Sequence, residues 1–171
     1  MIRFIMFCIL AQLVAFPCYA KGSIRTVEGV VTKVTDGDSI LVTATNGKKM
    51  NIRLYGVDAP EVGKPEQPYG KNAQRALEEM VANKHVRLEI MAVNKGKSTV
   101  AIVWTVENIV NKEMLKHGWA WAYRKELESS YASEYIDLED QARKERRGLW
   151  EESNPQPPWE FSKQQKKGKT R

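Results

Sequence analysis

Residues 24–55 read IRTVEGVVTKVTDGDSILVTATNGKKMNIRLY. This stretch predicts three consecutive strands, at residues 24–35, 39–45 and 49–55. The dipeptides Asp36-Gly37 and Asn46-Gly47 are typical turn signals and separate the three strands. Apolar and polar residues alternate in the second and third strands, as they do in strands with one buried face. We therefore expect adjacent strands joined by tight turns.

The apolar residues of the second and third strands also predict their register. Val42 is expected to pair with Ile52, and Ile40 with Leu54, because a shift by one residue would bury the polar side chains. This register leaves a loop of three residues, 46–48, which is a common hairpin connection with a glycine at positive φ.

The remaining patterns predict two more strands and three helices. Apolar residues at helical spacing cover residues 67–83, and shorter helices are expected at about 109–116 and 132–146. Alternating segments predict strands at about 86–90 and 99–106. Five short strands with a helix between the third and fourth indicate an α+β, mainly β fold: a closed five-stranded OB-fold barrel with three helices.

Composition limits the class of protein. The chain has 171 residues, with 27 Lys and Arg against 21 Asp and Glu, a net charge of +6 and a pI near 9.3. This length suits one compact domain. With 42% hydrophobic residues, the chain is neither disordered nor collagen-like. The basic bias concerns partners and solubility rather than the fold.

The first twenty residues, MIRFIMFCILAQLVAFPCYA, have the layout of a signal peptide. Arg3 precedes an apolar segment, and that segment is followed by a short small-residue ending at Ala20, where cleavage is expected. A buried N-terminal strand or helix is the alternative. Both cysteines lie in this segment, so the cleaved protein would have no disulfide, thiolate metal site or cysteine nucleophile. We expect export, to a periplasm or to the medium.

The expected domain occupies residues 21–150, and a basic tail follows at 151–171. The tail holds five cations and three prolines: Lys163, Lys166, Lys167, Lys169, Arg171, Pro155, Pro157 and Pro158. This composition predicts an unfolded extension that attracts phosphates.

Two acidic segments flank the predicted hairpin. Asp36-Gly37-Asp38 precedes the second strand, and Asp58-Ala59-Pro60-Glu61 follows the third. Asp38 and Asp58 share the inward parity of their strands, so we expect both at one rim of the barrel. Two carboxylates at such a short distance raise each other's pKa unless a cation lies between them. Hard oxygen ligands select Ca²⁺ or Mg²⁺, and Ala59 would add a backbone carbonyl.

Arg53 and Glu61 would complete a reaction site at this rim. The Arg53 guanidinium can bind a phosphate through two hydrogen bonds. Glu61 can orient or deprotonate a water molecule. A divalent ion, an arginine and a free carboxylate in one pocket are the parts needed for phosphodiester hydrolysis.

Four motifs together resemble the micrococcal nuclease (thermonuclease) family, and the resemblance spans about residues 26–150. The motifs are Val34-Thr35-Asp36-Gly37-Asp38-Ser39, Arg53-Leu54-Tyr55-Gly56-Val57-Asp58-Ala59-Pro60-Glu61, Gly118-Trp119-Ala120-Trp121 and Arg147-Gly148-Leu149-Trp150. The resemblance implies a five-stranded barrel with three helices that cleaves DNA and RNA. It also implies dependence on Ca²⁺ and products with 3′-phosphates.

The resemblance also implies roles for individual residues. The Ca²⁺ ligands would be the carboxylates of Asp38 and Asp58 and the carbonyl of Ala59. Asp36 would be an outer ligand or an acid that lies behind the ligands. Arg53 and Glu61 would be two of three catalytic residues. A nucleotide base would stack near Tyr123, with Trp121 as a weaker candidate, although both rings could instead belong to the core.

The third catalytic residue departs from the family pattern. Members usually carry Tyr-Gly-Arg ahead of the fifth strand, where this chain has Asn94-Lys95-Gly96-Lys97-Ser98. Anchoring the alignment on Gly96 puts Lys97 in the arginine's place, whereas anchoring it on the following strand puts Ser98 there. Lysine keeps the positive charge but lacks the guanidinium group that can bind two phosphate oxygens at once, so activity is expected to fall by orders of magnitude. Lys95 and Lys97 could instead only steer the substrate.

The expected function is that of an exported, Ca²⁺-dependent endonuclease that acts on DNA and RNA as a monomer, with no membrane partner after signal cleavage. The first alternative is an OB-fold barrel that binds single-stranded nucleic acid without cutting it, favoured by the missing arginine, the aromatic stretch and the basic tail. The second is a structural or protein-binding barrel.

Overall fold

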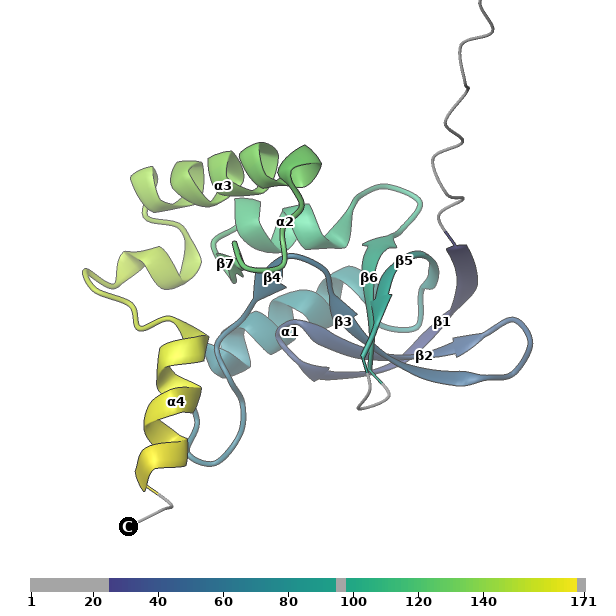
Figure 1. The fold of residues 1–171 in the computed structure, drawn as a ribbon, viewed down its shortest axis with the longest axis horizontal. Coiled ribbons are helices and arrows are strands. Elements are labelled where there is room, and N and C mark those ends of the chain that lie inside the picture. Colours follow the sequence, from purple (N-terminus) through teal and green to yellow (C-terminus); the bar gives the residue numbers. More distant parts are fainter. Residues whose placement is uncertain (1–24, 95–97, 169–171) are drawn as a thin grey trace, which may run out of the picture.

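The computed structural model describes residues 25–94 and 98–168 (Figure 1). The expected signal peptide, both cysteines, Lys95 and Lys97 lie outside these residues.

Within the described residues, five strands close a barrel in the order β1-β2-β3-β6-β5. Their bounds are β1 (Arg25–Asp36), β2 (Ser39–Ala44), β3 (Lys49–Leu54), β5 (His85–Val93) and β6 (Ser98–Trp104). β3 and β6 run parallel, and the other neighbouring pairs are antiparallel. The predicted five-stranded barrel is confirmed.

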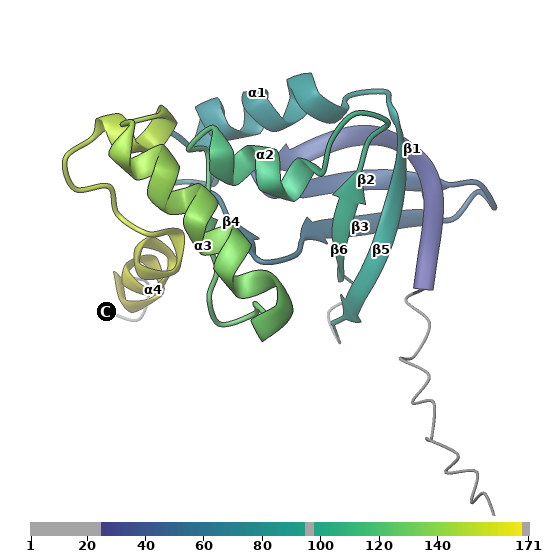
Figure 2. The ribbon, with the colours of Figure 1, turned by 90° about the horizontal axis from the view of Figure 1, so that it is seen from above.

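The described part of the chain holds four α-helices where the sequence predicts three. They are α1 (Gly70–Val81), α2 (Val110–Lys116), α3 (Ser129–Lys144) and α4 (Pro158–Gly168), and a 3₁₀ turn covers Gly148–Glu151. Figures 1 and 2 place α3 and α4 at the end of the molecule away from the hairpin that joins β2 to β3. None of these helices is long and apolar enough to cross a membrane.

The helix α4 corrects the expectation of an unfolded tail. Pro158 is its first residue, a position where proline's missing N–H forfeits no helical hydrogen bond. Trp159 packs against a cluster of buried side chains that includes Trp121 and Trp150. Partial burial of this aromatic ring favours an ordered segment despite its proline-rich and lysine-rich composition.

The hairpin between β2 and β3 does not have the predicted register. Ile40 faces Ile52 and Val42 faces Met50, whereas the prediction paired Val42 with Ile52 and Ile40 with Leu54. The prediction is wrong by two residues. Since side chains alternate with a period of two, the shift leaves the same residues inside the barrel.

Gly47 accounts for the shift. It has a φ of 80°, and its N–H donates to the Ala44 carbonyl at 2.8 Å. The Ala44 N–H donates to the Lys48 carbonyl at 2.9 Å, so the loop is 45–47 rather than 46–48. In this three-residue connection the left-handed glycine is the last loop residue, and the sequence reasoning placed it second.

A buried asparagine fixes the chain that leaves β3 toward the acidic rim. Asn111 of α2 is fully buried and accepts a hydrogen bond from the Val103 N–H at 2.8 Å. Its side-chain amide donates to the carbonyls of Tyr55 at 2.9 Å and Ala101 at 3.2 Å. These bonds join α2, β6 and the end of β3, and so hold the start of the 55–61 segment in place.

Candidate active site

The Asp36-Gly37-Asp38 turn packs directly on the segment that carries Asp58. A Cβ added at Gly37 would lie 2.7 Å from the Ala59 Cβ and 2.8 Å from the Ala73 Cβ. Such distances are too short for real carbon atoms, so only glycine permits this approach. The two acidic segments are therefore brought together as the sequence predicts.

Asp38 lies in the turn between β1 and β2 of the barrel, whereas Asp58 belongs to a separate two-stranded sheet. The predicted register, with Ile40 opposite Leu54, would put Asp38 opposite Gly56. This position is wrong by the same two residues, because the Asp38 carbonyl accepts a hydrogen bond from the Leu54 N–H at 2.9 Å. Asp38 is buried, at 8% exposed, in agreement with its inward parity. Asp58 lies in β4 (Val57–Asp58), where it pairs with Trp121 of β7 (Trp121–Ala122).

The carboxylates at this rim destabilise one another's charged forms. Burial raises the pKa of Asp58 to about 7, and the negative charges of Asp38 and Glu61 add to the shift. Burial likewise raises the pKa of Asp36 to about 6. Burial also raises the pKa of Asp38, although the Ser39 hydroxyl donates to its Oδ1 at 2.7 Å and partly offsets the effect. The rim thus concentrates negative charge that water cannot fully stabilise.

The donor atoms at the rim fit a hard divalent cation. Among the described residues, no three acidic, histidine or cysteine side chains come together as a metal site. A cation here would therefore depend on Asp38, Asp58 and oxygen atoms from the backbone and water. Oxygen donors suit Ca²⁺ or Mg²⁺. A divalent cation between these carboxylates would stabilise the charged form of Asp58 and lower its pKa.

Arg53 of β3 lies at the same rim. Its Nη1 is 3.8 Å from Asp38 Oδ2, and its Nη2 forms an ion pair with Glu126 Oε1. Its Cζ lies 5.6 Å from the centre of the Tyr123 ring. The guanidinium is thus held between two carboxylates and an aromatic ring, and its side chain is 23% exposed.

Glu61 is held through both its backbone and its side chain. Its N–H donates to the Gln67 Oε1 at 3.2 Å, and the Gln67 N–H donates to the Glu61 carbonyl at 2.9 Å. The Ser162 hydroxyl of α4 donates to Glu61 Oε1 at 3.1 Å. The predicted general base therefore has a fixed position at the rim.

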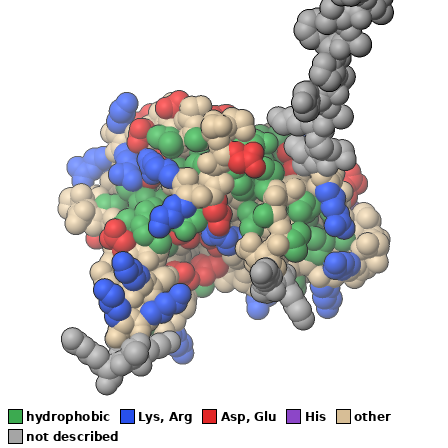
Figure 3. Space-filling view, viewed as in Figure 1, with side chains coloured by type: hydrophobic (Ala, Val, Ile, Leu, Met, Phe, Trp, Pro, Cys, Tyr) green, Lys and Arg blue, Asp and Glu red, His purple; other side chains and the backbone are tan. Residues whose placement is uncertain are grey.

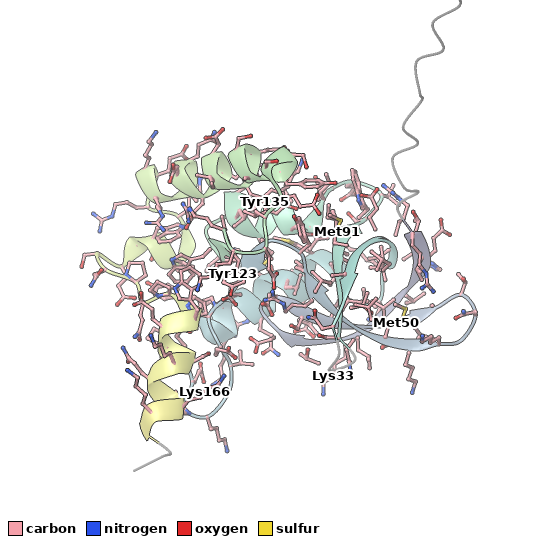
Figure 4. All side chains as sticks on the ribbon, viewed as in Figure 1. Lys33, Met50, Met91, Tyr123, Tyr135 and Lys166 are labelled. Atoms are coloured by element: carbon pink, nitrogen blue, oxygen red, sulfur yellow. The ribbon has the colours of Figure 1, made fainter. Side chains whose placement is uncertain are left out.

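The two aromatic candidates differ in exposure. Tyr123 is partly exposed and lies between the barrel and α4 in Figure 4. Trp121 is buried, at 3% exposed, and its ring centre is 4.9 Å from that of Trp150. This favours the core alternative for Trp121 and leaves Tyr123 as the more exposed of the two rings.

The third catalytic position stays a sequence prediction. Lys97 and the steering candidate Lys95 lie outside the described residues. Ser98 opens β6 opposite Asn51 of β3, and its carbonyl accepts a hydrogen bond from the Asn94 N–H at 3.0 Å.

Sequence reasoning missed three residues near the site: Glu126, Ser162 and Gln67. Glu126 pairs with Arg53, and the other two contact Glu61. None belongs to a motif quoted above, because each contact depends on how distant segments pack. Alternation of polar residues carries no signal for such pairings.

Comparison with known proteins identifies relatives of this chain. A family model described as staphylococcal nuclease homologue matches residues 51–152. This range includes Arg53, Asp58, Glu61 and Tyr123, and excludes β1, β2 and α4.

Three relatives illustrate the similarity. An uncharacterised endonuclease of Haemophilus influenzae is 32% identical over 80% of this chain and 73% of its own length. A micrococcal nuclease of Shigella flexneri is 31% identical over 81% of this chain and 82% of its own. The staphylococcal-like nuclease CAN1 of Arabidopsis thaliana is 36% identical over 71% of this chain, which spans only 36% of that relative.

Proposed function

This chain belongs to the family of staphylococcal nuclease homologues, and on that premise we propose that it is an exported, Ca²⁺-dependent endonuclease. Its substrates would be DNA and RNA, and its products would carry 3′-phosphates. One observation carries the proposal: the buried Asp38, the partly buried Asp58, Arg53 and Glu61 occupy the same rim of the barrel.

The acidic residues would hold the cation. The carboxylates of Asp38 and Asp58 and the carbonyl of Ala59 would be ligands, with Asp36 as an outer ligand. When bound, Ca²⁺ would neutralise charge on the phosphate and polarise its oxygen atoms. Export supports the choice of Ca²⁺, because a site with few carboxylates is weak and extracellular sites of this kind work at millimolar concentrations.

Arg53 and Glu61 would act on the phosphate and on the attacking water. Glu61 would accept the proton of a water molecule and orient it toward phosphorus. Arg53 would donate hydrogen bonds to the phosphate oxygens as their charge grows. Its contacts with Asp38 and Glu126 would orient the guanidinium before substrate arrives.

The remaining substrate contacts are sequence predictions. Tyr123 would stack a base beside Arg53. Lys97 would supply one positive charge in place of the usual arginine, or Ser98 would leave the position neutral. Either residue would lower turnover relative to a forked guanidinium. Lys95 would steer substrate.

A digestion experiment tests the proposal. Purified protein is incubated with plasmid DNA, denatured DNA and RNA in Ca²⁺, in Mg²⁺ and in chelator. We expect cleavage of all three substrates in Ca²⁺ and none in chelator, with 3′-phosphates on the products. Salt-sensitive binding without product in any ion would instead support a single-stranded nucleic-acid-binding barrel. A protein that neither binds nor cleaves these substrates would support a structural or protein-binding barrel.

A further inference from the structure

The helix α4 contacts the rim that carries the candidate catalytic residues. The Ser162 hydroxyl lies 3.1 Å from Glu61 Oε1. The Trp159 ring centre is 5.7 Å from that of Tyr123 and 6.5 Å from that of Trp121. The family model matches residues 51–152, so α4 lies beyond the part of the chain that it describes.

A second contact attaches the segment before α4 to the same place. The Gln67 side-chain amide donates to the Gln156 carbonyl at 2.6 Å, while its Oε1 accepts from the Glu61 N–H. Gln67 is buried, at 2% exposed. The C-terminal segment is therefore bonded to the Glu61 region at two separate points.

One face of α4 combines an aromatic ring with three cations. Trp159, Lys163, Lys166 and Lys167 follow the spacing i, i+4, i+7 and i+8, which places them on one side of a helix. With Ser162 they line a shallow hollow of about 490 Å³. Figure 3 shows Lys and Arg side chains gathered over α4, at the lower left of the picture.

This face continues the line of groups that begins at the catalytic rim. Arg53 lies against the Tyr123 ring, Tyr123 lies against Trp159, and the lysines follow along the helix. From Trp159 to Lys167 the helix rises about 12 Å. That distance matches three to four stacked nucleotides at about 3.4 Å each.

We propose that α4 extends the substrate site and binds the phosphodiester backbone of the nucleic-acid strand beyond the scissile phosphate. The inference rests on the proposed function. Charge complementarity identifies the occupant: ammonium groups at helical spacing track successive phosphates, and the adjacent ring offers a surface for a base. A dinucleotide at the rim would be too short to reach Lys166 and Lys167.

The test compares two triple variants with the same loss of charge. Lys163→Gln/Lys166→Gln/Lys167→Gln removes the cations of α4. The control, Lys33→Gln/Lys48→Gln/Lys49→Gln, removes exposed cations of the β1–β3 region. In Figure 4 the labelled Lys33 lies on the barrel, away from Lys166 on α4.

Binding is measured first, without cleavage. Fluorescence anisotropy with a labelled 20-nucleotide DNA strand, in chelator, gives the binding constant from low salt to 1 M salt. We expect the α4 variant to reduce the slope of log K against log salt by about 2, at about 0.7 per lysine. This corresponds to about 100-fold weaker binding at 0.1 M salt. The control is expected to keep the wild-type slope.

Cleavage assays then distinguish an effect on substrate binding from an effect on catalysis. The ratio of kcat/KM for the 20-nucleotide strand to that for a dinucleotide is expected to fall at least tenfold in the α4 variant and to stay unchanged in the control. Equal slopes for wild type and the α4 variant would overturn the proposal. So would equal losses in the two triple variants, or binding of anionic phospholipid vesicles that depends on α4 while DNA binding does not.

Failure of the proposed function would look different. A wild-type protein that cuts no substrate in Ca²⁺ would remove the nuclease assignment, whereas the anisotropy experiment in chelator would still decide whether α4 binds nucleic acid.

Discussion

Asp58 shows how one residue couples this fold to pH. Its pKa is raised to about 7 from a usual value of 3.8 by burial and by the charge of Asp38. The folded protein therefore binds more protons than the unfolded chain between about pH 4 and 7. Stability of the metal-free protein must fall as pH rises through this window, because ionised Asp58 is less favourable in the fold than in water.

The variant Asp58→Asn removes that charge and keeps the shape of the side chain. We expect the metal-free variant to be more stable than wild type at pH 8, by about 1–3 kcal/mol, since one pKa unit corresponds to about 1.4 kcal/mol. At pH 4 the two proteins should be nearly equal. Urea denaturation in chelator measures both values. A variant less stable than wild type at pH 8 would contradict the electrostatic account.

The role proposed for Glu61 differs from that of the aspartates that would bind the cation. The change Glu61→Gln keeps the hydrogen bond that Ser162 can donate but removes the proton acceptor. We expect kcat to fall by about 10²–10⁴. Binding of a DNA strand should change less than about threefold, since the loss is confined to the transition state.

Glu79→Gln on the exposed side of α1 is the matched control for Glu61. It makes the same chemical change outside the rim and should keep wild-type turnover. Equal losses of binding and turnover in Glu61→Gln would assign Glu61 a binding role.

At the scale of elements, the approach of the β1–β2 turn to Ala59 depends on a missing side chain. Gly37→Ala would place a Cβ 2.7 Å from the Ala59 Cβ and 2.8 Å from the Ala73 Cβ. Neither alanine has a flexible end that could move aside. We expect a loss of stability of about 1–3 kcal/mol and weaker Ca²⁺-dependent activity, because Asp36 and Asp38 shift relative to Asp58.

Gly63→Ala is the control for this prediction, because a Cβ there meets nothing within 4 Å. Thermal unfolding and DNA digestion of both variants measure the effect. If Gly37→Ala matched Gly63→Ala in both assays, close packing of the turn would not be what assembles the acidic rim.

The elements also show which structural levels sequence patterns can predict. Period-two alternation locates β2 and β3 to within a residue, because alternation reports directly on the buried face. It does not fix the register, since a two-residue shift buries the same side chains. Only the left-handed position of Gly47 selects the observed pairing.

The candidate site divides along the same line. The proximity of Asp38, Asp58, Arg53 and Glu61 could be predicted because these residues lie in two short motifs at the ends of adjacent strands, whereas their roles stay predictions. The ion pair of Arg53 with Glu126 and the formation of helix α4 could not be predicted, since both depend on contacts between segments far apart in sequence. Composition alone predicts an unfolded tail, whereas the packing of the partly buried Trp159 against Trp121 and Trp150 favours a helix.

At the scale of the whole molecule, Ca²⁺ and pH should act on folding through the same carboxylates. A cation that binds only the folded protein stabilises it by mass action. For a site with a dissociation constant near 1 mM, 10 mM Ca²⁺ would add about 1.4 kcal/mol. The ligands must be ionised to bind it, so the stabilisation should be present above about pH 7 and lost as pH falls through the raised pKa values of Asp58 and Asp36.

This linkage separates a bound cation from general salt effects. Thermal unfolding at pH 8 should shift upward with Ca²⁺ and not with an equal ionic strength of NaCl, while at pH 5 the two salts should act alike. Asp58→Asn should lose the Ca²⁺ shift at pH 8, because one ligand is gone. A Ca²⁺ shift of the same size at pH 5 and pH 8, or one retained in Asp58→Asn, would place the cation away from the Asp38–Asp58 rim.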